Sequence, residues 1–210
     1  MNERLYDPMI DAALLDNGLG PSFAVIVRAI IGTESGFRPT AFRNEPAIGD
    51  ASRGLMQILY RTARDMGFGG AASELLDPAT NIRYGVKYLA WQLRRKGFDL
   101  WAAVSAYNNG NGRRATAATR VCLARDQVSG ECVTYFTAQP GQFLNQPYVD
   151  KVQTAATYFA SVTGVEEPPA TIPPGETPPG GATTTGVLLW VVVSMLALGL
   201  VGAFARAGGR

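Results

Sequence analysis

Apolar residues recur every three to four positions in several stretches between residues 21 and 162, which is the spacing of amphipathic helices. These stretches carry Phe23, Val27 and Ile30; Ile82, Val86, Leu89 and Leu93; Trp101, Val104 and Tyr107; and Val149, Val152, Ala156 and Phe159. No stretch shows sustained alternation of apolar and polar residues, so few strands are expected. The pattern predicts a mainly α domain of about five to seven helices, with a long irregular loop at 108–145.

Helix-starting residues precede these stretches. Pro21 and Pro147 stand where a proline is tolerated, in the first turn of a helix, and Asp77 is an N-cap candidate followed directly by Pro78. Asp99 is placed to cap a further short helix. The boundaries therefore agree with the apolar spacing.

The end of the chain has a different pattern. Of the twenty residues at 186–205, sixteen are apolar and none is charged. As a helix this run would span roughly 30 Å, the thickness of a bilayer's hydrocarbon core, so one transmembrane helix is predicted. Arg206 and Arg210 form a short basic tail at 206–210, and the positive-inside rule places this tail in the cytoplasm and the globular domain on the other side.

A proline-rich segment separates the two parts. Residues 163–185 contain three Pro-Pro pairs, which begin at Pro168, Pro173 and Pro178. Such a chain favours polyproline II at about 3.1 Å per residue, so it could hold a domain up to roughly 70 Å from a bilayer. The expected organisation is a globular domain at 1–162, a linker at 163–185 and the membrane helix.

Composition narrows the chemistry. The chain contains no histidine, which excludes mechanisms and metal sites built on imidazole, and no metal or other cofactor is predicted. Its net charge of +2 does not favour a nucleic-acid partner. The polar start of the chain predicts no secretory signal, which favours a phage setting in which delivery does not use the secretory route. Cys122 and Cys132 are either a disulfide that closes a small loop or two free thiols.

One carboxylic acid stands in an unusual place. The apolar stripe of Phe23, Val27 and Ile30 continues four residues further to Glu34. Burial among apolar side chains and the negative end of a helix both favour the protonated acid, which is the form a general acid needs. A well-known lysozyme glutamate follows the same logic. The alternative is a helix-terminal glutamate that turns outward into water.

Four short motifs follow one another along the chain, and the first begins with this glutamate. They are Glu34-Ser35-Gly36-Phe37-Arg38-Pro39, then Gly54-Leu55-Met56-Gln57-Ile58, then Asn81-Ile82 with Gly85 and Tyr88-Leu89, and finally Ala106-Tyr107-Asn108-Asn109-Gly110. Together they resemble the soluble lytic transglycosylase family, whose fold is similar to goose-type lysozyme. The resemblance covers about residues 20–162 and implies cleavage of the β-1,4 bond between N-acetylmuramic acid and N-acetylglucosamine in peptidoglycan.

The resemblance also implies residue roles. Glu34 would be the single catalytic acid, Met56 and Gln57 would line the cleft near it, and Tyr107 and Asn108 would face it from a later helix. Lytic transglycosylases use the 6-hydroxyl of the muramic acid as nucleophile and give a 1,6-anhydro product, so a second carboxylate is not needed. Tyr107 is suited to donate a hydrogen bond near Glu34.

The sequence departs from the family pattern in one region. The family commonly has a serine nine residues after the acid, where this chain has Arg43, and about five extra residues precede Gly54. Ser52 is a candidate substitute. Glu45 and Asp50 remain candidate second carboxylates, which would give a hydrolytic muramidase. A further alternative is a non-catalytic, membrane-anchored module that only binds peptidoglycan.

Overall fold

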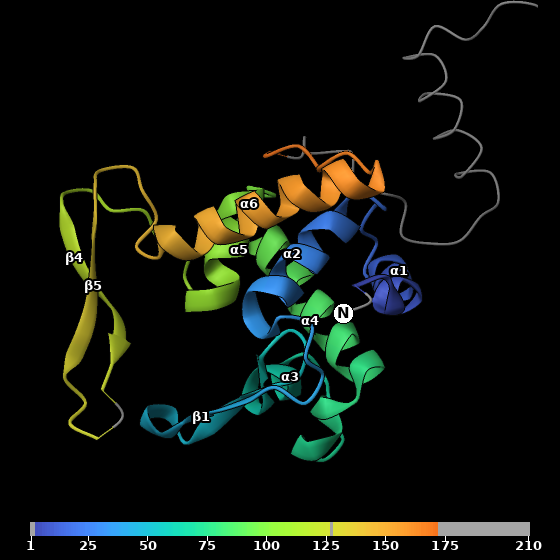
Figure 1. The fold of residues 1–210 in the computed structure, drawn as a ribbon, viewed down its shortest axis with the longest axis horizontal. Helices are drawn as coiled ribbons and strands as arrows, with labels where there is room; N and C mark the ends of the chain where they lie inside the picture. Colours follow the sequence, from blue (N-terminus) through green and yellow to red (C-terminus); the bar gives the residue numbers. More distant parts are fainter. Residues whose placement is uncertain (1–2, 127, 172–210) are drawn as a thin grey trace, which may run out of the picture.

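The computed structural model describes residues 3–126 and 128–171, and within these ranges the chain is mainly helical (Figure 1). The α-helices are α1 (Asp7–Asp16), α2 (Phe23–Ser35), α3 (Tyr60–Asp65), α4 (Pro78–Arg95), α5 (Leu100–Asn109) and α6 (Gln146–Thr163), with short 3-10 helices η1 (Glu3–Tyr6), η2 (Pro46–Ile48) and η3 (Ala72–Leu76). Six α-helices agree with the five to seven predicted. The predicted membrane helix at 186–205, the tail at 206–210 and most of the linker lie outside the described residues. None of the helices in the described ranges has the length and apolarity that a bilayer crossing requires.

The predicted caps are present. The Asp77 carboxylate accepts the Thr80 amide proton at 2.8 Å, and the Asp99 carboxylate accepts that of Ala102 at 2.9 Å. Pro147 lies in the first turn of α6, as expected. By contrast, α2 begins two residues after Pro21, because residues 20–23 form a turn in which the Phe23 amide bonds the Gly20 carbonyl.

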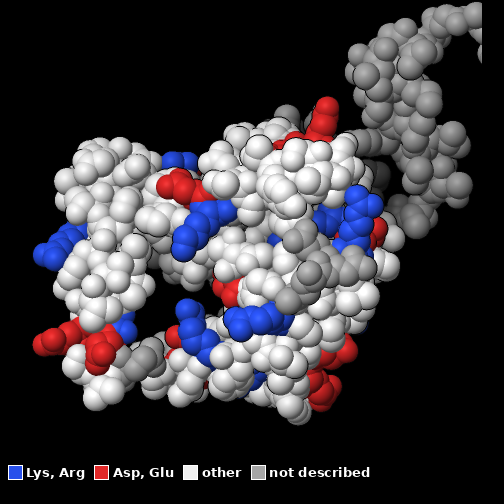
Figure 2. Space-filling view, in the orientation of Figure 1, with Lys and Arg blue, Asp and Glu red and all other residues white. Residues whose placement is uncertain are grey.

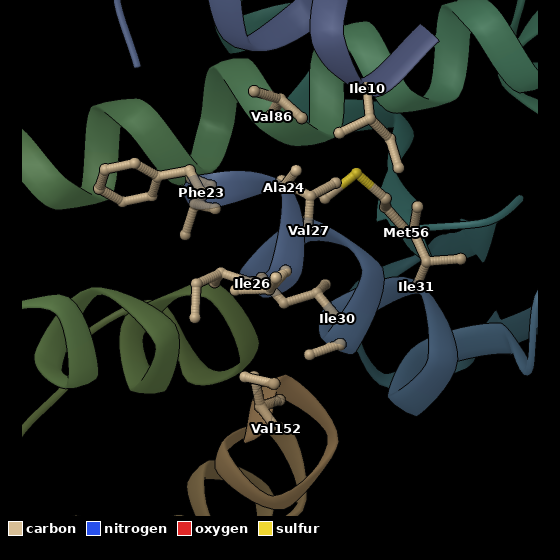
Figure 3. Packing of buried hydrophobic residues seen from close by; sticks show 14 of the residues in the cluster. Ile10, Phe23, Ala24, Ile26, Val27, Ile30, Ile31, Met56, Val86 and Val152 are labelled. Atoms are coloured by element: carbon tan, nitrogen blue, oxygen red, sulfur yellow. The ribbon is translucent and has the colours of Figure 1, made fainter. Parts of the chain in front are cut away.

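Helix α2 lies at the centre of the core (Figure 3). Every residue from Phe23 to Ile31 is buried, and side chains of α1, α4 and α6 surround them, including Ile10, Val86 and Val152. The spacing of apolar residues did not predict helix α1. Only three of its residues are buried, Ile10, Ala13 and Leu14, so its apolar stripe is short.

Strands occur in two places. A three-stranded antiparallel sheet contains β1 (Phe42–Glu45), β2 (Asp50–Arg53) and β3 (Ile58–Leu59). A two-stranded hairpin contains β4 (Thr119–Arg125) and β5 (Cys132–Ala138). The hairpin corrects the prediction of an irregular loop at 108–145. The sequence pattern did not indicate these strands, because most of their residues are solvent-exposed and neither face carries a continuous apolar row.

The first residues of the predicted linker belong to the folded domain. Helix α6 ends at Thr163, and Gly164 adopts the left-handed conformation that reverses the chain. Val165 then packs against the core, and the Ala170 carbonyl accepts the Leu100 amide proton at 2.9 Å. Residues 164–171, which follow the boundary expected at 162, therefore return to the start of α5.

Candidate active site

Glu34 lies in the last turn of α2. Helix α2 ends one residue later because Gly36 takes a left-handed conformation with φ of 59°, and its amide bonds the Gly32 carbonyl. The Glu34 side chain is half-buried, and the Tyr148 hydroxyl of α6 donates a hydrogen bond to its Oε1 at 2.8 Å. The carboxyl group therefore sits between two helices that are far apart in the sequence.

Burial raises the pKa of Glu34 to about 6. The Tyr148 hydrogen bond and the positive charge of Arg43 act in the opposite direction, because both stabilise the carboxylate. The negative charge of Glu45 raises the pKa further. Desolvation is the largest of these effects. Roughly a tenth of Glu34 is therefore protonated at pH 7, about 30-fold more than at its ordinary pKa, and the protonated form is the one a general acid requires.

Tyr148 is a site residue that sequence reasoning missed. Its pKa is raised well above 10, chiefly by burial and also by the Glu34 charge, so it is a neutral hydrogen-bond donor. A signal was present in the sequence. Tyr148 precedes Val152, Ala156 and Phe159 at helical spacing, so the apolar stripe of α6 begins on a polar aromatic just as that of α2 ends on Glu34.

The segment 54–57 is connected to this pair through Tyr107, whose hydroxyl bonds the Met56 carbonyl and whose pKa the Glu34 charge raises. Gly54 has φ of 72°, and a Cβ there would lie 2.3 Å from Asn81 Nδ2, so only glycine fits. The Asn81 side chain is fully buried, accepts the Met56 amide proton at 2.7 Å and donates to the Leu75 carbonyl at 2.7 Å. Asn81 therefore fixes the backbone of this segment against α4.

Met56 has a role different from the one expected. Its side chain is completely buried and points into the core, where it contacts Gly85 of α4 (Figure 3). A Cβ at Gly85 would lie 2.4 Å from the Met56 sulfur, which explains the glycine. Met56 thus faces the core with its side chain, and its backbone carbonyl accepts a hydrogen bond from Tyr107.

Tyr107 lies near Glu34 but does not bond it. Its hydroxyl donates to the Met56 carbonyl oxygen at 2.9 Å, and its ring packs on Tyr88 at 5.2 Å between centroids. Burial and the neighbouring Glu34 charge raise the Tyr107 pKa well above 10. The hydrogen bond that the sequence suggested for Tyr107 is made by Tyr148 instead.

Gln57 and Asn108 are held by hydrogen bonds to other parts of the chain. Gln57 adopts a left-handed backbone with φ of 46°, and its Nε2 donates to the carbonyls of Ala41 and Gly54 at 3.1 and 2.9 Å. Its amide oxygen is left to accept hydrogen bonds from a ligand. Asn108 is exposed at the end of α5, where its Oδ1 accepts a hydrogen bond from Asn145.

The candidate second carboxylates are both held by protein donors. Glu45 Oε1 accepts from Ser52 Oγ at 3.0 Å and from Arg43 Nε at 2.7 Å. Ser52 is buried on β2 and bonds Glu45 rather than Glu34. Asp50 accepts from the backbone amides of Ala51 and Arg61 and pairs with Arg53, contacts that together lower its pKa despite the opposing effect of desolvation.

Figure 2 shows the face of the molecule hollowed between the β4–β5 hairpin and the body of the domain, with side chains of both charges around the opening. The hairpin is closed by a disulfide between Cys122 and Cys132. A separate pocket of about 650 Å³ between α2 and α6 is lined in part by Phe37 and Tyr158 and does not include Glu34. Among the described residues, no group of acidic or cysteine side chains is arranged to hold a metal ion.

The transglycosylase SLT domain family matches residues 10–123 of this chain, which include Glu34, the 54–57 segment and Tyr107. The chain therefore belongs to this family.

Curated relatives and solved structures agree with this assignment. The chain is 39% identical over 124 residues to membrane-bound lytic murein transglycosylase C of Haemophilus influenzae, a match that covers 52% of the chain and 32% of the relative. It is 37% identical over 149 residues to the protein of the same name in Shigella sonnei, covering 62% and 40%. The matched region thus spans well under half the length of these relatives.

Two solved structures share the fold. The lytic transglycosylase Slt of Pseudomonas aeruginosa, solved as an inactive mutant, aligns with a TM-score of 0.56 and 21% identity over 80% of this chain and 26% of that chain. The 70 kDa soluble lytic transglycosylase of Escherichia coli aligns with a TM-score of 0.55 and 19% identity over 86% and 27%. At these identities the likeness concerns the fold alone.

Proposed function

We propose that this protein is a peptidoglycan lytic transglycosylase that uses Glu34 as its only catalytic carboxylate. The observation that carries the proposal is the state of Glu34: half-buried, raised to a pKa of about 6, and oriented by Tyr148. The family and the names of the relatives support the same activity.

The chemistry follows from a single carboxyl group. Protonated Glu34 donates its proton to the glycosidic oxygen as the bond from that oxygen to the muramic acid C1 breaks. The 6-hydroxyl of the same muramic acid then attacks C1, and the Glu34 carboxylate accepts the hydroxyl proton. The products are a glycan end with a free 4-hydroxyl and a 1,6-anhydro muramic acid, and Glu34 regains its proton.

The geometry disfavours the hydrolytic alternative. A hydrolase needs a second carboxylate that is free to activate water or to attack the sugar. Glu45 is engaged by Arg43 and Ser52, and Asp50 is engaged by two backbone amides and Arg53. Each carboxylate therefore has a structural task.

We further propose that the domain acts at a membrane surface on the non-cytoplasmic side. The uncharged run at 186–205 supports a membrane helix, and the relatives are named membrane-bound. The proposed tether leaves the domain after residue 171, beside α5 and α6. In Figure 1 this edge lies opposite the β1 end of the molecule.

The test compares Glu34→Gln with Glu45→Gln on purified peptidoglycan. Glu34→Gln should lower turnover by at least about 10²-fold, because it removes the proton donor while it keeps the shape of the side chain. Glu45→Gln should lower turnover far less than Glu34→Gln does, because Glu45 supplies no proton to the reaction. Loss of activity only in Glu45→Gln would contradict the assignment, and binding without turnover in the wild-type protein would indicate the non-catalytic alternative.

A further inference from the structure

A charged cluster on the small sheet lies within electrostatic reach of Glu34. It consists of Arg43 and Glu45 on β1 and Ser52 on β2. Arg43 and Ser52 are directly paired in the antiparallel register, so their side chains emerge on the same face of the sheet. The Gln57 side chain donates to the carbonyl of Ala41, two residues before Arg43, so the cluster lies next to the 54–57 segment. The charges of Arg43 and Glu45 also act on the Glu34 carboxyl.

The cluster orients the Arg43 guanidinium. One edge of this planar group, formed by Nε and Nη2, contacts Glu45 Oε1 at 2.7 Å from each nitrogen. Ser52 holds the same oxygen from the buried side at 3.0 Å. Because Glu45 binds the Nε and Nη2 edge, the Nη1 donors point away from it, and the Arg43 side chain is 68% exposed.

This arrangement of the Arg43 guanidinium is suited to bind a carboxylate. A guanidinium offers paired N–H donors that match a carboxylate, and holding one edge in place reduces the entropy lost when a ligand binds the other. The muramic acid of peptidoglycan carries a lactyl ether whose carboxyl group is either free or joined to a peptide stem with carboxylates of its own.

We propose that Arg43 binds a carboxylate on the muramyl substituent next to the scissile bond, so that the enzyme distinguishes muramyl glycans from uncharged N-acetylglucosamine polymers. This inference rests on the proposed function and deepens it by assigning a residue to substrate choice. Glu45 and Ser52 are positioning residues for Arg43.

Binding would also affect the acid. Free Arg43 lowers the pKa of Glu34, because its positive charge favours the carboxylate. A bound substrate carboxylate offsets that charge, so Glu34 would hold its proton more firmly when a muramyl ligand is present. Substrate choice and acid strength are therefore coupled through one arginine.

The experiment measures binding by full-length protein carrying Glu34→Gln, which prevents cleavage. The ligands are a muramyl tetrasaccharide with free lactyl carboxylates and a tetrasaccharide of N-acetylglucosamine, each titrated by calorimetry. In this background, Arg43→Gln should weaken the muramyl ligand by about 10-fold or more and change the uncharged ligand by less than about 2-fold, as expected for a charge-assisted hydrogen bond. Arg43→Lys should recover part of the loss.

Arg83→Gln is the matched control. Arg83 is 66% exposed and lies near a single acidic partner, Asp16, at 3.9 Å, on α4 rather than on the small sheet. It should leave both affinities unchanged. Equal weakening of both ligands by Arg43→Gln, or no weakening of either, would overturn the inference while leaving the proposed function intact. Failure of the Glu34→Gln protein to bind either glycan would instead count against the proposed function, and the inference would fall with it.

Discussion

The hydrogen bond from Tyr148 to Glu34 limits how far burial raises the pKa of the acid, and Tyr148→Phe tests this directly. The hydroxyl donates to the carboxylate at 2.8 Å and lowers a pKa that burial raises to about 6. A hydrogen bond to a charged group contributes about 1.5–3 kcal/mol, against roughly 1 kcal/mol for a neutral pair. Removing it should therefore raise the Glu34 pKa by roughly one unit, since 1.36 kcal/mol corresponds to one unit.

The assay is the pH dependence of kcat/KM. A general acid must be protonated, so activity falls as pH rises through its pKa. The falling limb should lie near pH 6 in the wild-type protein. In Tyr148→Phe it should move upward by roughly one unit. The maximal rate should decrease as well, because the carboxyl group loses a contact that orients it.

Tyr158→Phe is the control for this change. Tyr158 also lies on α6, but the residue is 55% exposed and its ring packs on Phe159. The falling limb of kcat/KM against pH in Tyr158→Phe should coincide with that of the wild-type protein. A Tyr148→Phe limb that stays in place, or that moves to lower pH, would refute the electrostatic reasoning.

Three further predictions concern stability. In the folded protein the Glu34 pKa of about 6 exceeds its ordinary value of 4.5, so the folded state binds more protons between these values and stability falls as pH rises through this window. Glu34→Gln should thus be more stable than wild type at pH 7 by up to about 2 kcal/mol, with the advantage lost near pH 4, as urea unfolding at both pH values will show. Replacing Cys122 and Cys132 with serine should speed amide exchange in 119–138 and leave exchange in α2 unchanged, since the disulfide closes only the hairpin. A chain ending at 162 should be less stable than one ending at 171 by about 1–3 kcal/mol, because it loses the Val165 packing and the bond to Leu100; equal unfolding midpoints would contradict this.

The helical part of the fold was predictable because its information is local. Each apolar stripe follows the helical repeat, and caps such as Asp77 and Asp99 act within three residues of themselves. Helix α1 was missed because only three of its ten residues are buried. The β4–β5 hairpin was missed because its stability comes from strand pairing and a disulfide rather than from a buried apolar face.

The site was predictable only in part. Glu34 was predictable because it continues the apolar stripe of a single helix, and such a pattern can be read from the local sequence. Its partner Tyr148 lies 114 residues away, and only the packing of α6 on α2 brings the two together. The contact between Met56 and Tyr107 likewise joins residues that are 51 positions apart in the sequence. The Tyr107 hydroxyl donates to the Met56 carbonyl and therefore does not bond Glu34.

Product analysis tests the central claim that one carboxylate, Glu34, performs the reaction with the substrate's own hydroxyl as nucleophile. Purified peptidoglycan is digested with wild-type protein in water enriched in ¹⁸O, and the released muropeptides are analysed by mass spectrometry. We expect 1,6-anhydro muramic ends that contain no ¹⁸O from the wild-type protein, and none of these products from Glu34→Gln. Reducing muramic ends labelled with ¹⁸O would show that water is the nucleophile and would contradict the claim.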